Sequence, residues 1–375
     1  MVNLRDVAEL ASVAPSTVSR VVNNAPNIAP ETRKVVEEAI ERLGYRPNRR
    51  GRPIRSTQSD PTPRKTNRIT LLTTGMRRAV MNSPVYMSVI HGVEAALAEK
   101  EKVMVLRHLP NDETTSTTLF SQKTDGVLHF GGTTLNDDLR KHLREIPCVG
   151  IMGGIDSEEE WDHVSYANHR IGRLAADYLL QRGHQHMAIV LQTDTSSKKP
   201  KYSTFRERLD VFSSTVRKKG GDCLELADEH ILTYGDYTQK GSPEAIQKLF
   251  DTLLAVPSAS RPTGVFLTAD ILVPPFYQEM QRRGMTPGKE LELISCNNEH
   301  LLLAHLHPRP ATIDIHAEQV GRRAVEQLLW RIENPAPPQM TLLLNPTLVE
   351  TDERVGTDVS EPSGNEKELN QELVS

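Results

Sequence analysis

Apolar and polar positions near the start of this chain repeat with the spacing of helices. Small apolar residues recur every three or four positions, which is typical of an amphipathic helix. They are Val7, Leu10 and Ala11, followed by Val18, Val21 and Val22. Val13 falls between the two sets, where the pattern is interrupted. The pattern therefore predicts two short helices that are joined by a tight turn and share one small core.

The second of these helices has an outward face of small polar residues. Pro15 falls in its first turn, where the missing N–H costs nothing. Ser16, Thr17 and Ser19 allow a close approach to a groove, and Arg20 can reach a base edge or a phosphate. This arrangement is typical of a helix-turn-helix that binds DNA. Ordinary helix bundles also contain such pairs, so the pattern alone leaves both interpretations open.

A third helix is predicted over Ile28–Tyr45, with Pro30 at its start and Gly44 at its end. Its predicted buried stripe consists of Val35, Val36, Ala39, Ile40 and Leu43. The stretches LRDVAELASVAPSTVSRVVNN and TRKVVEEAIERLGYRPN resemble the headpiece of the LacI/GalR family of bacterial transcription repressors. This resemblance implies that Pro15, Ser16 and Arg20 read bases. It places a further set near phosphates: Asn3, Leu4, Thr17, Ser19, Asn23, Asn27, Thr32, Tyr45 and Asn48.

Charge is distributed unevenly along the 375 residues. Residues 1–68 hold 13 Lys and Arg against 7 Asp and Glu, whereas the remainder holds 32 against 42. A basic segment on an acidic body suits a protein that touches DNA at one end.

The segment 47–68 reads as a basic linker, rich in proline and poor in apolar residues. We expect it to be disordered without a partner. The family resemblance implies a hinge helix here, with Ile54 inserted into the minor groove. Gly51 and Pro53 disfavour a helix, and the run around Arg50 and Arg52 resembles an AT-hook, an extended segment in a narrow A·T minor groove. Nonspecific phosphate contacts are the third interpretation.

From Ile69 onward, buried strands alternate with amphipathic helices. Strands are predicted at 68–75, 103–109, 125–132, 146–154, 186–192, 263–270, 290–298 and 341–350. Helices are predicted at 85–100, 172–183, 205–220, 273–284 and 317–332. Such alternation predicts an α/β core of two doubly wound parallel-sheet subdomains. The predicted organisation is a small all-α helix-turn-helix headpiece over 1–46, the linker over 47–68, an effector-binding and dimerisation core over 69–355, and a disordered tail over 356–375.

The core also resembles this family, whose effector domain shares its fold with periplasmic sugar-binding proteins. The resemblance is carried by RPTGVFLTAD, MQRRGMTPGKELELISCNN, RPATIDIHAEQVGRRAVEQLL and NPTLVE. Ligands in such folds lie at the carboxyl ends of the strands, between the halves. The resemblance implies an effector site formed by Tyr86, Asn168, Arg208, Asp270 and Asn297.

Each of these residues also has a structural interpretation. Arg208 lies on a charged helix and is solvated in that interpretation, Asp270 caps the helix that follows, and Tyr86 only packs. Ala167 and Asn297 stand where the family commonly has acids. Fewer carboxylates make an anionic ligand more plausible than usual, although a neutral sugar is still the first expectation.

Other features narrow the function class. No run of about 18 apolar residues is present, and the N-terminus has no secretory pattern, so we expect a cytoplasmic protein without a membrane partner. The sequence contains no nucleophile elbow, phosphate loop or HExxH, which favours a regulator over an enzyme. Three separated cysteines are expected to pack, and the pair His184 and His186 lacks a third metal ligand.

The sequence thus predicts a homodimeric, sequence-specific DNA-binding transcription regulator, a repressor, controlled by a sugar or sugar-like effector and without a cofactor. A secreted binding protein and an α/β enzyme are the competing classes. The effector, the operator, the direction of the response and any pairing of dimers into tetramers stay open.

Overall fold

The computed structural model describes residues 4–22, 28–43, 66–74, 76, 78–109, 123–131, 135, 137–152, 160–193, 204–225, 232–233 and 243–350. The chain divides into two compact units, Met1–Arg64 and Lys65–Ser375. Each unit is described by itself. The proposed linker and tail lie almost wholly outside the described residues.

The N-terminal unit is built from three helices: α1 (Leu4–Leu10), α2 (Pro15–Val22) and α3 (Pro30–Leu43). The core of this unit consists of Val7, Ala8, Ala11, Val18, Val21, Val36 and Ala39. The predicted helices are confirmed, but two of the apolar positions were assigned wrongly. Leu10 and Val35 are 43% and 47% exposed. In a core this small, each helix buries only a narrow row of side chains. In α3 this row consists of Val36 and Ala39.

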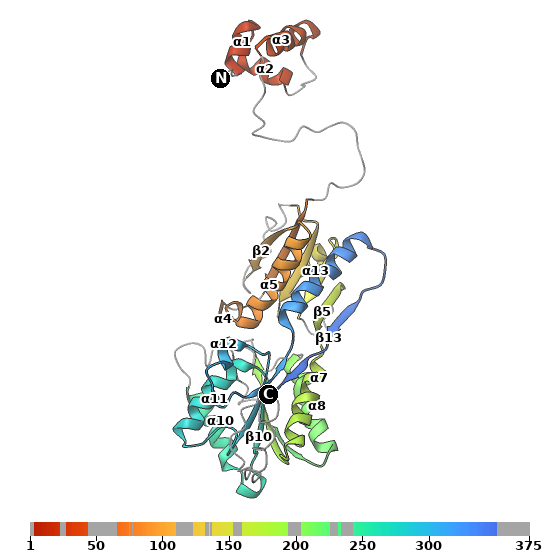
Figure 1. The fold of residues 1–375 in the computed structure, drawn as a ribbon. Coiled ribbons are helices and arrows are strands. Elements are labelled where there is room, and N and C mark those ends of the chain that lie inside the picture. Colours follow the sequence, from red (N-terminus) through yellow and green to blue (C-terminus); the bar gives the residue numbers. More distant parts are fainter. Residues whose placement is uncertain are drawn as a thin grey trace, which may run out of the picture. The chain divides into compact units, whose positions relative to one another are not determined.

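The second unit begins with a six-stranded parallel sheet, with the strand order β13-β5-β4-β3-β1-β2. This first half of the unit contains β1 (Arg68–Thr74), α4 (Arg78–Met81), α5 (Pro84–Glu99), β2 (Val103–Leu109), β3 (Gly126–Gly131), α6 (Asp137–Arg144), β4 (Cys148–Ile151), β5 (Asp162–Tyr166), α13 (Ala317–Glu333) and β13 (Thr341–Leu344). Helices α5 and α13 pack side by side on one face of the sheet (Figure 1), and α6 packs on the other.

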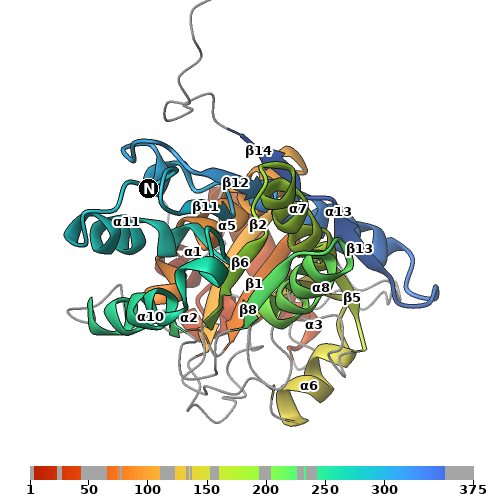
Figure 2. The same cartoon turned by 90° about the horizontal axis from the view of Figure 1, so that it is seen from below.

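The second half contains a six-stranded sheet with the order β14-β12-β11-β10-β6-β8, in which only the edge strand β14 is antiparallel. Its elements are α7 (Asn168–Gln181), β6 (His186–Val190), β7 (Gln192–Thr193), α8 (Thr204–Lys218), β8 (Asp222–Glu225), β9 (Leu232–Thr233), α10 (Pro243–Ala255), η3 (Ser258–Ser260), β10 (Gly264–Leu267), η4 (Asp270–Leu272), α11 (Val273–Arg282), β11 (Glu292–Cys296), α12 (His300–Leu303), β12 (Ala311–Asp314) and β14 (Thr347–Val349). Figure 2 shows α10 and α11 on one side of this sheet and α7 and α8 on the other.

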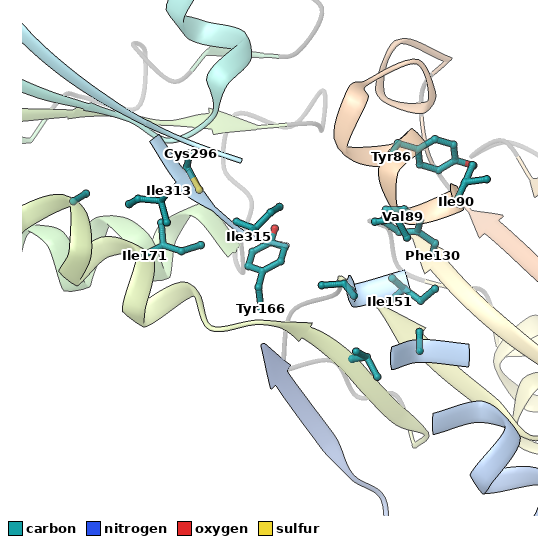
Figure 3. Packing of buried hydrophobic residues seen from close by; sticks show 14 of the residues in the cluster. Tyr86, Val89, Ile90, Phe130, Ile151, Tyr166, Ile171, Cys296, Ile313 and Ile315 are labelled. Carbon is teal, nitrogen blue, oxygen red and sulfur yellow. The ribbon is translucent and has the colours of Figure 1, made fainter. Parts of the chain in front are cut away.

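The chain passes between the two halves three times, from β5 to α7, from β12 to α13 and from β13 to β14. The largest hydrophobic cluster follows these crossings. Tyr166 and Ile315 lie between the side chains of the second half, such as Ile171, and those of the first half, such as Val89 (Figure 3). Ligand-dependent movement of one half against the other would therefore act on this cluster.

The two doubly wound parallel sheets are confirmed, but several elements were missed. Strands β5, β8 and β12 and helices α6 and α10 were not predicted, nor were the short elements α4, β9 and α12, and α7 begins at Asn168 rather than Gly172. Strand β5 reads DHVSY, in which polar residues point to both faces and conceal a fully buried strand. Helix α6 has only Leu139 and Leu143 as a buried stripe, which is too short for periodicity to reveal.

Two histidines are buried on the α6 face of the first sheet. His129 of β3, Gly150 of β4 and His163 of β5 lie in one row of the parallel register. His129 Nε2 and Thr74 Oγ1 are 2.9 Å apart, and the imidazole meets the Trp161 ring edge-on at 6.0 Å. Burial, with a smaller effect of His163, lowers the pKa of His129 to about 4. His129 is therefore neutral in the folded protein near neutral pH.

We expect His129 to make the protein acid-sensitive. Its pKa is about 4 in the fold and 6.5 ordinarily, so its contribution to stability is complete above pH 6.5 and is lost as the pH falls toward 4. At pH 5 the loss is on the order of 2 kcal/mol. Urea unfolding of wild type and His129→Gln at pH 7 and pH 5 measures it, because other titrating groups affect both proteins alike. Equal losses in the two proteins would contradict this assignment.

Candidate functional site

The exposed face of α2 carries the predicted base-reading residues. Pro15, Ser16 and Arg20 are all exposed, whereas Val18 and Val21 on the opposite face are buried in the core of the N-terminal unit. Because α2 is eight residues long and its outward side chains are short, its backbone can approach a DNA groove closely. The geometry fits the recognition helix of a helix-turn-helix.

The remaining predicted DNA contacts are only partly described. Thr17, Ser19 and Thr32 are partly exposed, while Leu4 packs against the core of the N-terminal unit. The others lie outside the described residues: Asn3, Asn23, Asn27, Tyr45, Asn48, Arg50, Arg52 and Ile54. The hinge-helix, AT-hook and phosphate-contact interpretations of the linker therefore stay predictions.

Arg208 of α8 is buried, and its guanidinium group contacts two hydrogen-bond acceptors and two aromatic rings. Its Nε donates to Asn168 Oδ1 at 2.8 Å, and its Nη1 donates to the Thr268 carbonyl at 2.5 Å. The guanidinium lies over the Phe205 ring at 4.9 Å and over the Tyr166 ring at 5.4 Å. The side chain is 1% exposed, so the interpretation of Arg208 as a solvated helix residue is wrong.

Helix packing fixes the backbone beneath Arg208. Helix α7 crosses α8 at Gly172, where a Cβ atom would lie 2.5 Å from the Arg208 carbonyl oxygen. Only glycine permits this approach without displacing one helix. The same two helices thereby hold Asn168 and Arg208 within hydrogen-bonding distance of each other.

Asp270 follows β10 and is fully buried. Its Oδ1 accepts from the Thr312 hydroxyl at 2.8 Å, and its Oδ2 accepts from the Glu299 N–H at 2.6 Å. Burial raises the pKa of Asp270 to about 6, against the opposing effect of these hydrogen bonds and one from Ser295. Asp270 thus ties the end of β10 to β12 and to the loop after β11, and it does not cap α11, whose N-cap residue is Leu272.

Of the other two predicted effector residues, Asn297 lies at the same strand ends and Tyr86 belongs to the first half. Asn297 is partly exposed, has a positive φ of 118° and follows β11 directly. Tyr86 of α5 is 3% exposed and stacks on Phe130 with ring centroids 5.2 Å apart. The structure therefore brings Asn168 and Arg208 into direct contact, places Asp270 two residues beyond Thr268, and gives Tyr86 a packing role in the absence of ligand.

Glu299 is a buried acid at this position that the sequence reading missed. It lies two residues after Asn297, is 7% exposed and contacts both Asp270 and the first turn of α5. The signal was present in SCNNEH, where an acid follows a buried strand.

Two other features have plain structural explanations. His184 contacts Thr263 Oγ1 and Glu292 Oε2, both at 2.9 Å, so it fastens the amino-terminal edge of the second sheet. Among the described residues, no group of three or more metal-binding side chains occurs. Within the same residues, no helix is both long and apolar enough to cross a membrane.

Comparison with known families and proteins gives matches to both units. Residues 3–48 match the family described as Bacterial regulatory proteins, lacI family, and residues 176–352 match the Periplasmic binding protein-like domain. The Ribose operon repressor of Escherichia coli (strain K12) is 26% identical over 356 residues, covering 93% of this chain and 99% of that protein. The HTH-type transcriptional repressor PurR of Aliivibrio fischeri (strain MJ11) is 28% identical, covering 93% and 97%.

Solved structures share the fold over most of the chain. The transcriptional regulator CelR in complex with cellobiose superposes with a TM-score of 0.61 at 24% identity, covering 93% of this chain and 99% of that chain. The lac repressor dimer bound to operator and the anti-inducer ONPF gives a TM-score of 0.59 at 19% identity, covering 93% and 98%. The arrangement of the two sheets is thus one that regulators of this kind adopt.

Proposed function

The chain belongs to the lacI family of bacterial regulatory proteins, and from that membership we propose that it is a transcription repressor controlled by a small-molecule effector. The observation that carries the proposal is α2, which buries Val18 and Val21 and exposes Ser16 and Arg20. Curated relatives that match nearly the whole chain are repressors. Binding to double-stranded operator DNA is the activity that this surface supports best.

We propose that the protein acts as a homodimer on a near-palindromic operator. One recognition helix of eight residues reads one major groove, so useful affinity requires two half-sites. The lac repressor, which shares this fold, was solved as a dimer bound to its operator. The proposed place of action is the cytoplasm, where operator DNA is found.

The effector is proposed to bind at the strand ends around Arg208, Asn168, Asp270 and Asn297, with Tyr86 on the opposite half. A sugar or sugar-like compound is the first candidate, because relatives include a ribose operon repressor and a fold neighbour was solved with cellobiose. We propose that the site serves binding and not catalysis. Effector and operator affinities are then reciprocally coupled.

The test of DNA recognition is Arg20→Ala. If Arg20 reads a base, specific affinity falls by about 1–3 kcal/mol, and discrimination at one position of each half-site is lost. An operator is first obtained by selection from random duplexes, and binding of each variant is then measured by fluorescence anisotropy at fixed salt.

Arg42→Ala is the matched control, because Arg42 is exposed on α3 of the same unit. The Arg42→Ala substitution should lower DNA affinity only slightly, and by the same factor for every DNA sequence. Unchanged affinity and unchanged sequence preference in Arg20→Ala would contradict the assignment of α2 as the recognition helix.

A further inference from the structure

Glu299 lies where the two halves of the second unit meet, and it contacts both. Within the second half, its backbone N–H donates to Asp270 Oδ2 at 2.6 Å. Across to the first half, its side-chain Oε1 accepts from the Val85 N–H at 3.2 Å. Val85 is in the first turn of α5, where the positive end of the helix dipole favours an acceptor. The Glu299 carboxyl group therefore joins the end of β11 to α5.

The second oxygen of this carboxyl group is buried and unsatisfied. Glu299 Oε2 has no hydrogen-bond partner among the residues that the structure describes. Leaving a buried acceptor or donor unpaired destabilises a folded protein. Such an atom is expected where a ligand supplies the missing partner.

The surroundings of Glu299 are those of the proposed effector site. Burial and then the charge of Asp270 raise the pKa of Glu299 to about 8, against the smaller opposing effects of the Val85 N–H and the Asn297 side chain. Near neutral pH the carboxyl group is therefore mostly protonated. In that state Oε2 can either donate or accept, so a hydroxyl group is a suitable partner, and an ammonium group is suitable after loss of the proton.

We propose that Glu299 is a further effector-binding residue whose Oε2 accepts a hydrogen bond from a hydroxyl or amino group of the effector. This inference rests on the proposed function and specifies the ligand class. Near neutral pH the Asp270 carboxyl group carries the negative charge at these strand ends, which disfavours a phosphate or carboxylate ligand. The mostly protonated Glu299 adds a hydrogen-bonding group without adding charge.

The contact with α5 gives this hydrogen bond a second consequence. An effector that engages Oε2 acts on a residue whose backbone N–H donates to Asp270 of the second half and whose carboxyl group accepts from Val85 of the first. Binding at Glu299 is therefore sensitive to the relative position of the halves, as a switch that responds to effector requires.

The experiment compares three full-length proteins: wild type, Glu299→Gln and the control Glu244→Gln. Glu244 is exposed in the first turn of α10. Neutral sugars, the corresponding amino sugars and sugar phosphates are screened by thermal shift, and Kd values are measured for those that bind. Glutamine keeps the acceptor for Val85 but places an NH₂ group at the other position. We expect a neutral or amino sugar to bind wild type and Glu244→Gln alike, and Glu299→Gln at least about tenfold more weakly.

The two donor chemistries are separated by matched pairs of compounds. An amino sugar that binds more tightly than its hydroxyl counterpart identifies an ammonium donor, and equal binding identifies a hydroxyl. The ligand-free melting temperature is a second measurement. It should be close to that of wild type in Glu299→Gln, because a neutral amide of the same shape replaces a mostly protonated carboxyl group and the contact with Val85 is retained.

Several results would overturn the assignment. These are equal affinity of wild type and Glu299→Gln for the bound sugar, binding of sugar phosphates alone, binding of no compound with a free hydroxyl or amino group, or a ligand-free melting temperature lowered by more than about 5 °C. The proposed function is tested separately by operator binding. A sugar phosphate that releases operator from wild type would leave the repressor proposal standing while rejecting Glu299.

Discussion

Replacing Asp162 by alanine is expected to lower the free energy of unfolding of the core by about 3–5 kcal/mol. Asp162 is 1% exposed and accepts from Arg331 Nη2 at 2.6 Å, from Gln327 Nε2 at 2.6 Å and from the Met340 N–H at 2.9 Å. Removal of the carboxylate leaves a largely buried guanidinium without its counter-ion. The Arg331 hydrogen bonds to the Pro337 and Pro338 carbonyls offset only part of that cost.

The ion pair between Asp162 and Arg331 stabilises the turn between α13 and β13. Its loss should therefore also weaken the pairing of the edge strand β13 with β5. The pKa of Asp162 reflects the same contacts. Burial opposes the charged form, but hydrogen bonds from Arg331, Gln327 and Met340 outweigh it, and the pKa lies below its ordinary value. The contribution of Asp162 is accordingly present above its unfolded pKa and is lost as the pH falls through the folded one.

Urea unfolding at pH 7, followed by circular dichroism, measures this effect against Glu160→Ala. Glu160 is two residues away and pairs with Arg144 at 3.0 Å, but both side chains are well exposed, so its loss should cost about 0–1 kcal/mol. If Asp162→Ala is destabilised no more than Glu160→Ala, the buried pair of Asp162 and Arg331 does not stabilise the core as proposed.

Replacing Arg208 by lysine is expected to weaken effector binding about a hundredfold or more while leaving operator affinity without effector within about twofold of wild type. Lysine keeps the charge but cannot bond Asn168 Oδ1 and the Thr268 carbonyl in the same geometry. Loss of the guanidinium plane also removes the contacts with Phe205 and Tyr166. Alanine would be a poorer test, because it would leave two buried acceptors unpaired and destabilise the fold itself.

Two measurements test this prediction. Effector affinity is measured by calorimetric titration, and operator affinity is measured with and without effector. Arg206→Lys is the control, since Arg206 lies on the same helix and is 59% exposed in its side chain. Loss of operator binding by Arg208→Lys without effector, in a protein that still melts as wild type does, would show that Arg208 acts on the structure of the free protein and not on the ligand.

Local patterns in the sequence determined most of the architecture. Helical periodicity and a proline in the first turn are properties of neighbouring residues, so α1, α2 and α3 were predicted together with the exposed face of α2. Buried parallel strands such as β4 and β10 are continuous runs without polar side chains, which the sequence reveals directly. The resemblance to the lacI family was carried by these same stretches.

Only the tertiary structure decided which polar groups are buried and what they contact. Strand β5 was missed because Asp162 and His163 read as surface residues until α13 and β4 cover them. A solvated Arg208 was an open alternative in the sequence, because its partners Asn168 and Thr268 are 40 and 60 positions away. Glu299 gains its role from a contact with a helix 214 positions earlier. Burial and long-range pairing depend on how distant segments pack, and no local pattern in the chain records that.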